Sequence, residues 1–190
     1  MNPLQKFEFW YKKAVRAKEI SPDAMALASV SKNGKPSVRF ILFKGIRENG
    51  VSFFTNYKSR KASDFSENSY AALTVFWPKI YLQVRLEGKI KKLSAAESDK
   101  YWKTRPRQSQ IGAWSSPQSQ TIVSRRALEQ TFKLLELKFA GREIPRPPHW
   151  GGYTLIPSRI EFWTGQKFRL HERELFTRRK NRWVREILAP

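Results

Sequence analysis

The sequence predicts a mainly β protein with peripheral helices, of the α+β class, built on a closed or partly closed antiparallel barrel. Short runs of β-branched and aromatic residues recur along the chain, and Gly, Pro and Asn turn signals separate them. Four segments with the apolar spacing or the capping residues of helices lie before or between these runs. The sequence contains neither Gly-x-Gly-x-x-Gly nor a Walker-type loop, so a doubly wound nucleotide-binding fold is not supported.

The first third of the chain is expected to form one helix followed by three strands. Apolar residues at three- and four-residue steps predict an amphipathic helix over residues 4–18. Asn33-Gly34 is a strong hairpin signal between the first two strands, and Asn49-Gly50 leads into the third. The three expected strands cover residues 24–30, 37–46 and 51–55.

Helices and strands alternate in the rest of the chain. Ser59 is a candidate N-cap for a short helix, and strands are expected over residues 70–77 and 80–91. Ser94 and Glu97 form a capping-box pattern for a helix that should end just before Pro106. A longer helix is expected over residues 121–139, and four short strands should follow the Pro-rich connector at residues 145–148.

Length and composition narrow the possible classes of protein. We expect residues 1–190 to form a single domain that begins with a helix (1–20) and ends with strands (160–190). The chain has no cysteine and only two histidines, so disulfides, thiolate chemistry and multi-histidine metal sites are excluded, and redox chemistry would need a bound organic cofactor. Without a signal-peptide pattern or an apolar run of about 18–20 residues, we expect a soluble, cytoplasmic protein with no membrane partner.

The positive charge of the chain indicates anionic partners. The 37 Lys and Arg residues against 16 Asp and Glu residues give a net charge of +21. A field of this size attracts phosphorylated metabolites, nucleic acids or anionic membranes. A basic nucleic-acid-binding protein is therefore an alternative, although no helix-turn-helix, zinc-finger or ribonucleoprotein motif supports it.

Three segments have side chains suited to phosphate. Arg39 and Lys44 lie on one expected strand, where their odd spacing places them on opposite faces for two different anions. Arg60 and Lys61 begin an expected helix, where free backbone N–H groups already favour an anion.

The third segment carries Tyr101, Arg105 and Ser109 at four-residue steps. Tyr101 and Arg105 would share a helix face, and Ser109 lies just beyond the break at Pro106. A phenol, a guanidinium and a hydroxyl that converge would suit a phosphate monoester. Taken singly, each of the three segments is more often an ordinary basic surface.

The most informative segment covers residues 160–173. Bulky and aromatic residues flank a Gly-containing turn, which predicts two short strands. On the second strand Arg169, His171 and Arg173 would share one face. Leu170 would point the other way. Two guanidiniums and an imidazole on one face suit anion binding or proton handling, and an exposed basic strand face is the alternative.

The order of residues in this segment closely resembles the C-terminal signature of the pyridoxine/pyridoxamine 5′-phosphate oxidases, in which Ile-Glu-Phe-Trp leads to Arg-Leu-His, an acidic residue and Arg. The Ser-Gln-Ile-Gly-Ala-Trp run at residues 109–114 and the phosphate-type segments follow the same family's order and spacing. The resemblance implies an antiparallel split β-barrel that binds FMN, and a homodimer with FMN at the interface between the subunits.

The resemblance also implies a role for individual residues. FMN contacts are implied for Arg39, Phe40, Ile41, Leu42, Phe43, Lys44, Phe54, Thr55, Arg60, Lys61, Gln83, Gln118, Ser119, Trp163 and Arg173. Substrate contacts are implied for Lys44, Tyr101, Arg105, Ser109, Arg169, Leu170 and His171. Arg169 and His171 are the catalytic candidates, because the resemblance places them at the pyridine ring of the substrate.

The activity implied is oxidation of pyridoxine or pyridoxamine 5′-phosphate to pyridoxal 5′-phosphate, with the flavin accepting a hydride and dioxygen regenerating it with release of hydrogen peroxide. Phe54 departs from the family pattern, in which a tyrosine is usual. A related flavin oxidase for another aromatic substrate, such as a phenazine precursor, is a further alternative. The retained phosphate set at Tyr101, Arg105 and Ser109 argues against it, because a substrate without phosphate would leave these groups unpaired.

Overall fold

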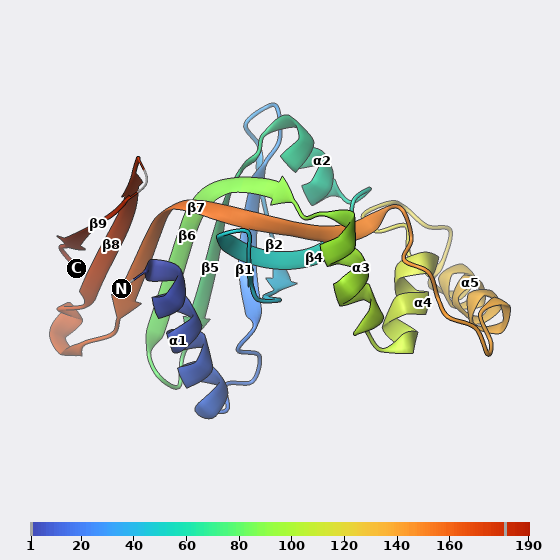
Figure 1. Ribbon diagram of the computed structural model, residues 1–190, viewed down its shortest axis with the longest axis horizontal. Helices are drawn as coiled ribbons and strands as arrows, with labels where there is room; N and C mark the ends of the chain where they lie inside the picture. The colour runs from blue at the N-terminus through green and yellow to red at the C-terminus, as the bar shows by residue number, and fades with distance from the viewer. Residues whose placement is uncertain (1, 181) are drawn as a thin grey trace.

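The computed structural model describes residues 2–180 and 182–190, and within them the chain forms nine strands, five α-helices and one 3-10 helix (Figure 1). The strands are β1 (Ala24–Val30), β2 (Pro36–Leu42), β3 (Ile46–Arg47), β4 (Gly50–Asn56), β5 (Tyr70–Trp77), β6 (Leu82–Lys92), β7 (Trp150–Thr164), β8 (Glu172–Arg179) and β9 (Arg182–Leu188). The helices are α1 (Pro3–Arg16), α2 (Arg60–Glu67), α3 (Ala95–Lys103), α4 (Arg107–Ser115), α5 (Arg125–Lys138) and the 3-10 helix η1 (Lys167–Arg169).

All of these strands belong to one antiparallel sheet in the order β2-β1-β5-β6-β7-β4-β3, with β8 paired to β7 and β9 paired to β8. β7 is 15 residues long and changes partner along its length. Its first part pairs with β4 and its last part with β8, while β6 runs beside nearly all of it. The described residues show no pairing between the end strands β2 and β3, so the barrel is only partly closed.

A glycine permits a bend where β6 and β7 run together. The register of the two strands shifts between Glu87 and Gly88. A Cβ atom at Gly88 would lie 2.1 Å from Ile156 O, so the close approach of the two backbones requires glycine. Pro157 pairs with Gly88 at this irregularity, where its missing N–H does not interrupt a regular ladder.

The main core contains side chains from the sheet, α1 and α2. Strands β1 and β6 alternate buried and more exposed residues, as strands with one buried face do. From α1, Phe7 contacts Phe43 with 5.2 Å between ring centroids, and Trp10 contacts Phe162 at 5.0 Å. A second, smaller core lies between α3, α4 and the start of β7 and contains Trp102, Ile111, Ile144 and Trp150.

The predicted antiparallel fold with peripheral helices is confirmed. The Asn33-Gly34 hairpin joins β1 to β2, with Gly34 in the left-handed region at φ 74°. Ser94 caps α3 as expected, and its hydroxyl accepts a hydrogen bond from Glu97 N. Ser59 stands at the N-cap of α2, but its side chain makes no capping hydrogen bond.

Several boundaries differ from the prediction. The strand expected over residues 37–46 is interrupted around Gly45, whose φ is 99°, and continues as the short β3. The helix expected from residue 121 begins only at Arg125, because Ser124 caps it by accepting a hydrogen bond from Ala127 N. The four short strands expected after the Pro-rich connector are three, since β7 is continuous. α4 was not predicted at all, and it begins directly after Pro106.

The predicted second strand of the C-terminal signature is wrong in its first half. Its first residues form η1, in which Arg169 has a positive φ of 63°, and β8 begins only after His171. The chain turns here because Gln166 N donates a hydrogen bond to His171 Nδ1 at 3.1 Å, which closes a compact loop. Arg169, Leu170 and His171 therefore do not alternate across a strand.

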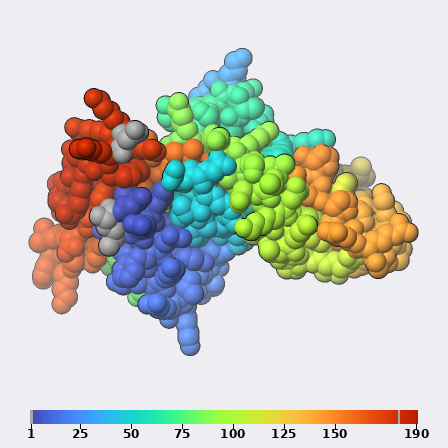
Figure 2. Space-filling view, in the orientation of Figure 1, coloured from blue at the N-terminus to red at the C-terminus, as the bar shows by residue number. Residues whose placement is uncertain are grey.

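The molecule is elongated, with β8 and β9 at one end of its long axis and α4 and α5 at the other (Figures 1 and 2). Among the described residues, no helix combines the length and the apolar character needed to cross a membrane.

Candidate functional site

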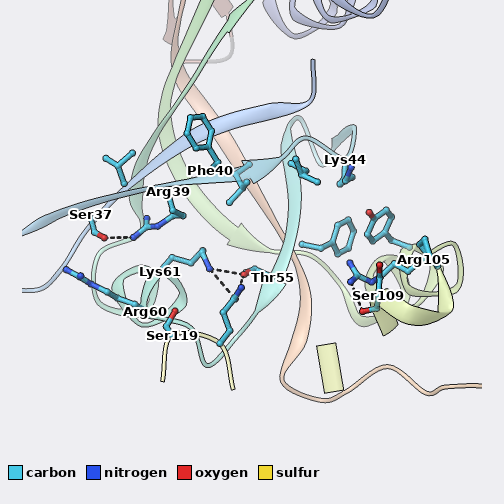
Figure 3. Close-up of a pocket in the computed structure, with 17 residues that line it drawn as sticks. Ser37, Arg39, Phe40, Lys44, Thr55, Arg60, Lys61, Arg105, Ser109 and Ser119 are labelled. Atoms are coloured by element: carbon cyan, nitrogen blue, oxygen red, sulfur yellow. Dashed lines mark hydrogen bonds between the residues drawn. The ribbon is translucent and has the colours of Figure 1, made fainter. Parts of the chain in front are cut away.

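A pocket of about 690 Å³ opens between β2, β4, the start of α2 and the corner that joins α3 to α4 (Figure 3). Fourteen residues predicted to contact cofactor or substrate line it: Arg39, Phe40, Ile41, Leu42, Lys44, Phe54, Thr55, Arg60, Lys61, Tyr101, Arg105, Ser109, Gln118 and Ser119. Their charged groups gather at two ends of the pocket in Figure 3. We name these the Lys61 end (Arg39, Arg60, Lys61) and the Arg105 end (Lys44, Tyr101, Arg105, Ser109).

Lys61 is held by oxygen atoms that carry no charge. Its Nζ donates to Thr55 Oγ1 at 3.0 Å, Ser59 Oγ at 3.2 Å and Gln118 Oε1 at 3.3 Å. The residue is only 7% exposed, and desolvation by burial, together with the nearby Arg39 charge, lowers the pKa of Lys61 to about 8. No carboxylate among the described residues pairs with it, so an anion would supply the missing counter-charge.

Arg39 projects from β2 toward the same end of the pocket. Its guanidinium donates to Ser29 Oγ and Ser37 Oγ, both at 2.7 Å, and Asp64 lies 3.9 Å away. Desolvation by burial lowers the pKa of Arg39, and the Asp64 carboxylate partly opposes this shift. Arg39, Arg60 and Lys61 thus bring three positive charges to this end of the pocket, and Asp64 lies near Arg39 alone. The N–H groups at the start of α2 add further positive potential.

The Arg105 end is formed by the corner between α3 and α4. α3 ends at Lys103, so Arg105 lies outside the helix and does not share a helical face with Tyr101 as predicted. The corner still brings the predicted residues together, because Arg105 Nη2 donates to Ser109 O at 2.9 Å and Tyr101 lines the same pocket. Lys44 reaches this end from the segment after β2, and its Nζ pairs with Asp23 at 2.9 Å.

The guanidinium of Arg105 is incompletely hydrogen-bonded. Its Nε is buried and has no hydrogen-bond partner among the described residues. Desolvation by burial lowers the pKa of Arg105, and the neighbouring Tyr101 phenol partly opposes this. Phe54 stacks on Tyr101 with 3.9 Å between centroids and 17° between ring planes. A guanidinium with free donors beside a flat aromatic surface suits the phosphate ester of an aromatic compound.

A second group of predicted residues lies on β6, β7 and β8 and does not line this pocket. Gln83, Trp163 and Arg173 are neighbours across these three strands, and we name them, with His171, the Trp163 group. The ring of His171 packs on Trp163 with 4.6 Å between centroids. Arg173 Nε donates to the buried Glu161 at 2.9 Å, which raises the pKa of Arg173.

Three predicted residues are placed where sequence reasoning did not expect them. Arg169 and Leu170 are exposed on the loop around η1 and do not line the pocket of their own chain. Phe43 lies in the main core against Phe7 and Tyr11, so its side chain does not reach the pocket.

Sequence reasoning also missed residues that support the site. Ser37 precedes Arg39 by two positions, so the two-residue period of a strand could have indicated it. Ser29 holds Arg39 from β1, and Trp150 lies against Arg105 from the start of β7. No local signal connects these two residues with their arginines, because the pairs come from different strands or loops.

The fold and the pocket define the class of this protein as a split barrel of the flavin-binding type. A pyridoxamine 5′-phosphate oxidase-related, FMN-binding protein of Nostoc punctiforme PCC 73102 superposes with a TM-score of 0.79 over 100% of this chain and 99% of that chain, and its 19% identity supports the fold alone. PhzG from Burkholderia lata 383, solved in complex with tetrahydrophenazine-1-carboxylic acid, has a TM-score of 0.95 and 33% identity, covering 99% of this chain and 92% of that chain.

Sequence comparisons are more specific. Residues 11–139 match the family model of pyridoxamine 5′-phosphate oxidase, and residues 150–190 match the pyridoxine 5′-phosphate oxidase C-terminal dimerisation region. The pyridoxine/pyridoxamine 5′-phosphate oxidase of Cyanothece sp. (strain PCC 7425 / ATCC 29141) is 47% identical over 100% of this chain and 89% of its own. That of Paraburkholderia phytofirmans (strain DSM 17436 / LMG 22146 / PsJN) is 50% identical over 93% and 83%.

The chain therefore belongs to the pyridoxamine 5′-phosphate oxidase family, and it is an oxidoreductase of that type. The resemblance seen in the sequence is confirmed. The alternative of a non-enzymatic nucleic-acid-binding protein is set aside.

Proposed function

We propose that this chain is an FMN-dependent oxidase that converts pyridoxine or pyridoxamine 5′-phosphate to pyridoxal 5′-phosphate, with dioxygen as electron acceptor and hydrogen peroxide as the second product. The observation that carries this proposal is one pocket with two separate cationic ends. Cofactor and substrate each bring one phosphate monoester, and each dianion needs its own set of donors. The names of the 47–50% identical relatives support the choice of substrate.

The Lys61 end fits the phosphate of FMN. A buried ammonium surrounded by neutral oxygens needs an anionic partner, and two arginines face the same space. We assign the phosphate to Arg39, Arg60 and Lys61, with hydroxyl donors from Thr55 and Ser119. The remaining pocket-lining positions predicted for FMN are Phe40, Ile41, Leu42, Lys44, Phe54 and Gln118.

The Arg105 end fits the phosphate of the substrate. Arg105 and Lys44 supply charge, and Tyr101 and Ser109 supply hydroxyl groups on the same side of the pocket. Ser109 O takes one hydrogen bond from Arg105 Nη2, and phosphate oxygens would accept from the remaining terminal donors of the guanidinium.

The working form would be a homodimer. In the Trp163 group, Gln83, Trp163 and Arg173 are predicted to contact FMN and His171 the substrate, but the group lies outside the pocket of its own chain, and residues 150–190 resemble a dimerisation region. On the edge strand β2, Val38, Phe40 and Leu42 are 65%, 77% and 49% exposed, and they form an apolar wall of the pocket that a second chain would cover. In this arrangement the Trp163 group of one chain completes the pocket of the other.

Bound FMN would supply the redox chemistry, by accepting a hydride and passing the electrons to dioxygen. The residues of the chain bind and orient the substrate: the Arg105 end holds its phosphate, and Arg169 and His171 would approach its pyridine ring from the second chain. Because His171 Nδ1 accepts a hydrogen bond from Gln166 N, the neutral imidazole carries its proton on Nε2, so His171 would act as a positioning donor at the ring.

The visible absorption spectrum of the purified protein tests the cofactor, before and after incubation with FMN. Flavin-loaded protein should then form aldehyde and peroxide from both phosphorylated vitamers, and the two rates will give the substrate preference. A protein that stays colourless with FMN, or that binds FMN without oxidising either vitamer, would contradict the proposal. The cytoplasmic location and the single-domain organisation stay predictions.

The similarity to PhzG favours one second candidate, oxidation of a partly reduced phenazine carboxylic acid. Such a substrate carries no phosphate, so it would leave the donors of the Arg105 end without an anionic partner. Turnover of the phenazine precursor in the absence of vitamer oxidation would favour this second candidate.

A further inference from the structure

Arg105 is held more by aromatic rings than by hydrogen bonds. Its guanidinium carbon lies 4.6 Å from the ring centroid of Trp150 and 5.7 Å from that of Trp102. Its side chain donates to Ser109 O and lies beside the Tyr101 phenol, and among the described residues no carboxylate forms an ion pair with it. Of the two aromatic rings that restrict how the guanidinium is oriented, the indole of Trp150 is therefore the nearer.

Trp150 is itself rigidly placed. It is 4% exposed and begins β7, where it pairs in register with Asn56 at the end of β4. Its ring lies nearly parallel to those of Phe54 (5.5 Å, 13°) and Tyr101 (6.2 Å, 9°). Gly152, two residues further along β7, leaves room for this stack, because a Cβ atom there would lie 2.8 Å from Phe54 Cε1.

We propose that Trp150 is a positioning residue that orients Arg105 for the phosphate of the substrate, although it does not touch the substrate itself. The inference rests on the proposed function, because it takes a phosphorylated substrate as the ligand of the Arg105 end. An arginine side chain that is already immobilised on an aromatic face loses less conformational freedom when it binds an anion. Trp150 thus acts on substrate affinity through Arg105.

Direct binding measurements on the FMN-loaded protein test the inference. Pyridoxal 5′-phosphate is the probe, titrated into wild type, Trp150→Leu, Trp150→Phe, Arg105→Ala and the Arg105→Ala/Trp150→Leu double variant. A desolvated cation–π contact predicts that Trp150→Leu weakens binding about ten- to thirtyfold, with a smaller loss for Trp150→Phe, which keeps an aromatic face. In the Arg105→Ala background, Trp150→Leu should weaken the binding of pyridoxal 5′-phosphate less than about twofold, because Trp150 acts through the arginine that this background lacks.

A merely structural role would give a different pattern. Trp150→Leu would then weaken binding equally in both backgrounds, and that result would overturn the inference, as would Trp150→Leu binding like wild type. Ile144→Val is the matched control, because Ile144 belongs to the same small core and its aliphatic side chain offers Arg105 no aromatic face. It should lower thermal stability while leaving the affinity for pyridoxal 5′-phosphate unchanged.

A second readout does not depend on the substrate. Phenylglyoxal modifies accessible arginines, and peptide mass spectrometry reports the rate at Arg105. Release of the guanidinium from Trp150 should increase that rate severalfold in Trp150→Leu and not in Ile144→Val. If wild type fails to bind pyridoxal 5′-phosphate while the modification rate changes as expected, the proposed function fails and the positioning contact stands. An unchanged rate in Trp150→Leu contradicts the contact itself.

Discussion

Lys61 combines burial with a positive charge that no carboxylate of the described chain neutralises. Burial lowers the pKa of Lys61 to about 8, against 10.5 for an ordinary lysine. At pH values between about 8 and 10.5, folding without a ligand therefore favours loss of the Lys61 proton. Below about pH 8 the charged, buried ammonium therefore lowers the free energy of unfolding of the cofactor-free protein. This destabilisation is relieved as the pH rises from about 8 toward 10.5. A bound phosphate would reverse the preference by stabilising the ammonium.

We expect FMN affinity to fall as the pH rises through about 8, because binding then requires Lys61 to take up a proton. Lys61→Ala should weaken FMN binding about ten- to a hundredfold at neutral pH and should flatten this pH dependence. Fluorescence titration of flavin at several pH values measures both effects. Lys58→Ala is the control, because Lys58 is exposed in the same turn and does not line the pocket. Equal FMN affinity in wild type and Lys61→Ala would remove Lys61 from the site.

Arg169, Leu170 and His171 give a second prediction at the scale of residues. Arg169→Ala and His171→Ala should lower kcat or kcat/KM while FMN stays bound, because both groups are assigned to the reacting ring. Leu170 is 67% exposed, so Leu170→Ala should change the free energy of unfolding by less than about 0.5 kcal/mol. Steady-state kinetics with pyridoxine and pyridoxamine 5′-phosphates, combined with thermal unfolding, measures these effects. Wild-type turnover in both Arg169→Ala and His171→Ala would make this loop an ordinary basic surface.

Among the elements, α1 is tied to the C-terminal strands by a charged contact inside an aromatic cluster. Lys6 Nζ pairs with Glu174 at 2.7 Å and lies 4.6 Å from the centroid of Phe162, and Glu174 also accepts from Arg185 Nε at 2.9 Å. Desolvation by burial raises the pKa of Glu174, but Lys6 and Arg185 together outweigh it, so the pKa is lower than in the unfolded chain. The carboxylate therefore stabilises the fold above about pH 4.5, and this contribution is lost as the pH falls through the lowered pKa.

We expect Glu174→Gln to reduce the free energy of unfolding by about 1–3 kcal/mol at neutral pH, because it leaves the half-buried Lys6 without its counter-charge. The difference from wild type should shrink as the pH falls below about 4.5, where the carboxyl of the unfolded chain becomes protonated, and it should vanish below the lowered pKa of the folded state. Urea unfolding at neutral pH and below about pH 4.5 measures this difference in the free energy of unfolding. Glu129→Gln provides the comparison: its pair with Arg125 is exposed on α5, and its loss should cost no more than about 0.5 kcal/mol. Equal losses in the two variants would contradict a special role for Glu174.

At the scale of the whole molecule, the apolar exposed face of β2 and the separation of the Trp163 group from the pocket lead to one prediction. Light scattering should report twice the chain mass of 22.3 kDa. Val38→Glu, at a position 65% exposed on β2 that also lines the pocket, should shift the protein toward monomer because a charge would be buried in the interface, and it should weaken FMN binding. Val123→Glu, at a position 98% exposed, should leave both unchanged. A monomer that binds one FMN per chain with full affinity would rule out the shared site.

Local patterns in the sequence determined much of this protein. The hairpin at Asn33-Gly34, the cap at Ser94 and the alternation of the strands follow from interactions between near neighbours, and these are confirmed. The pocket residues could also be predicted, because their order and spacing match a family, and the structure brings fourteen of them together.

Only the tertiary structure decided the contacts between remote segments. Trp150 meets Arg105 because β7 starts beside the α3–α4 corner, and Ser29 meets Arg39 because β1 and β2 pair in one particular register. The loop at Arg169 failed as a strand prediction because a hydrogen bond between side chain and backbone replaced the expected ladder. Such contacts depend on distances fixed by packing, and spacing along a chain does not contain those distances.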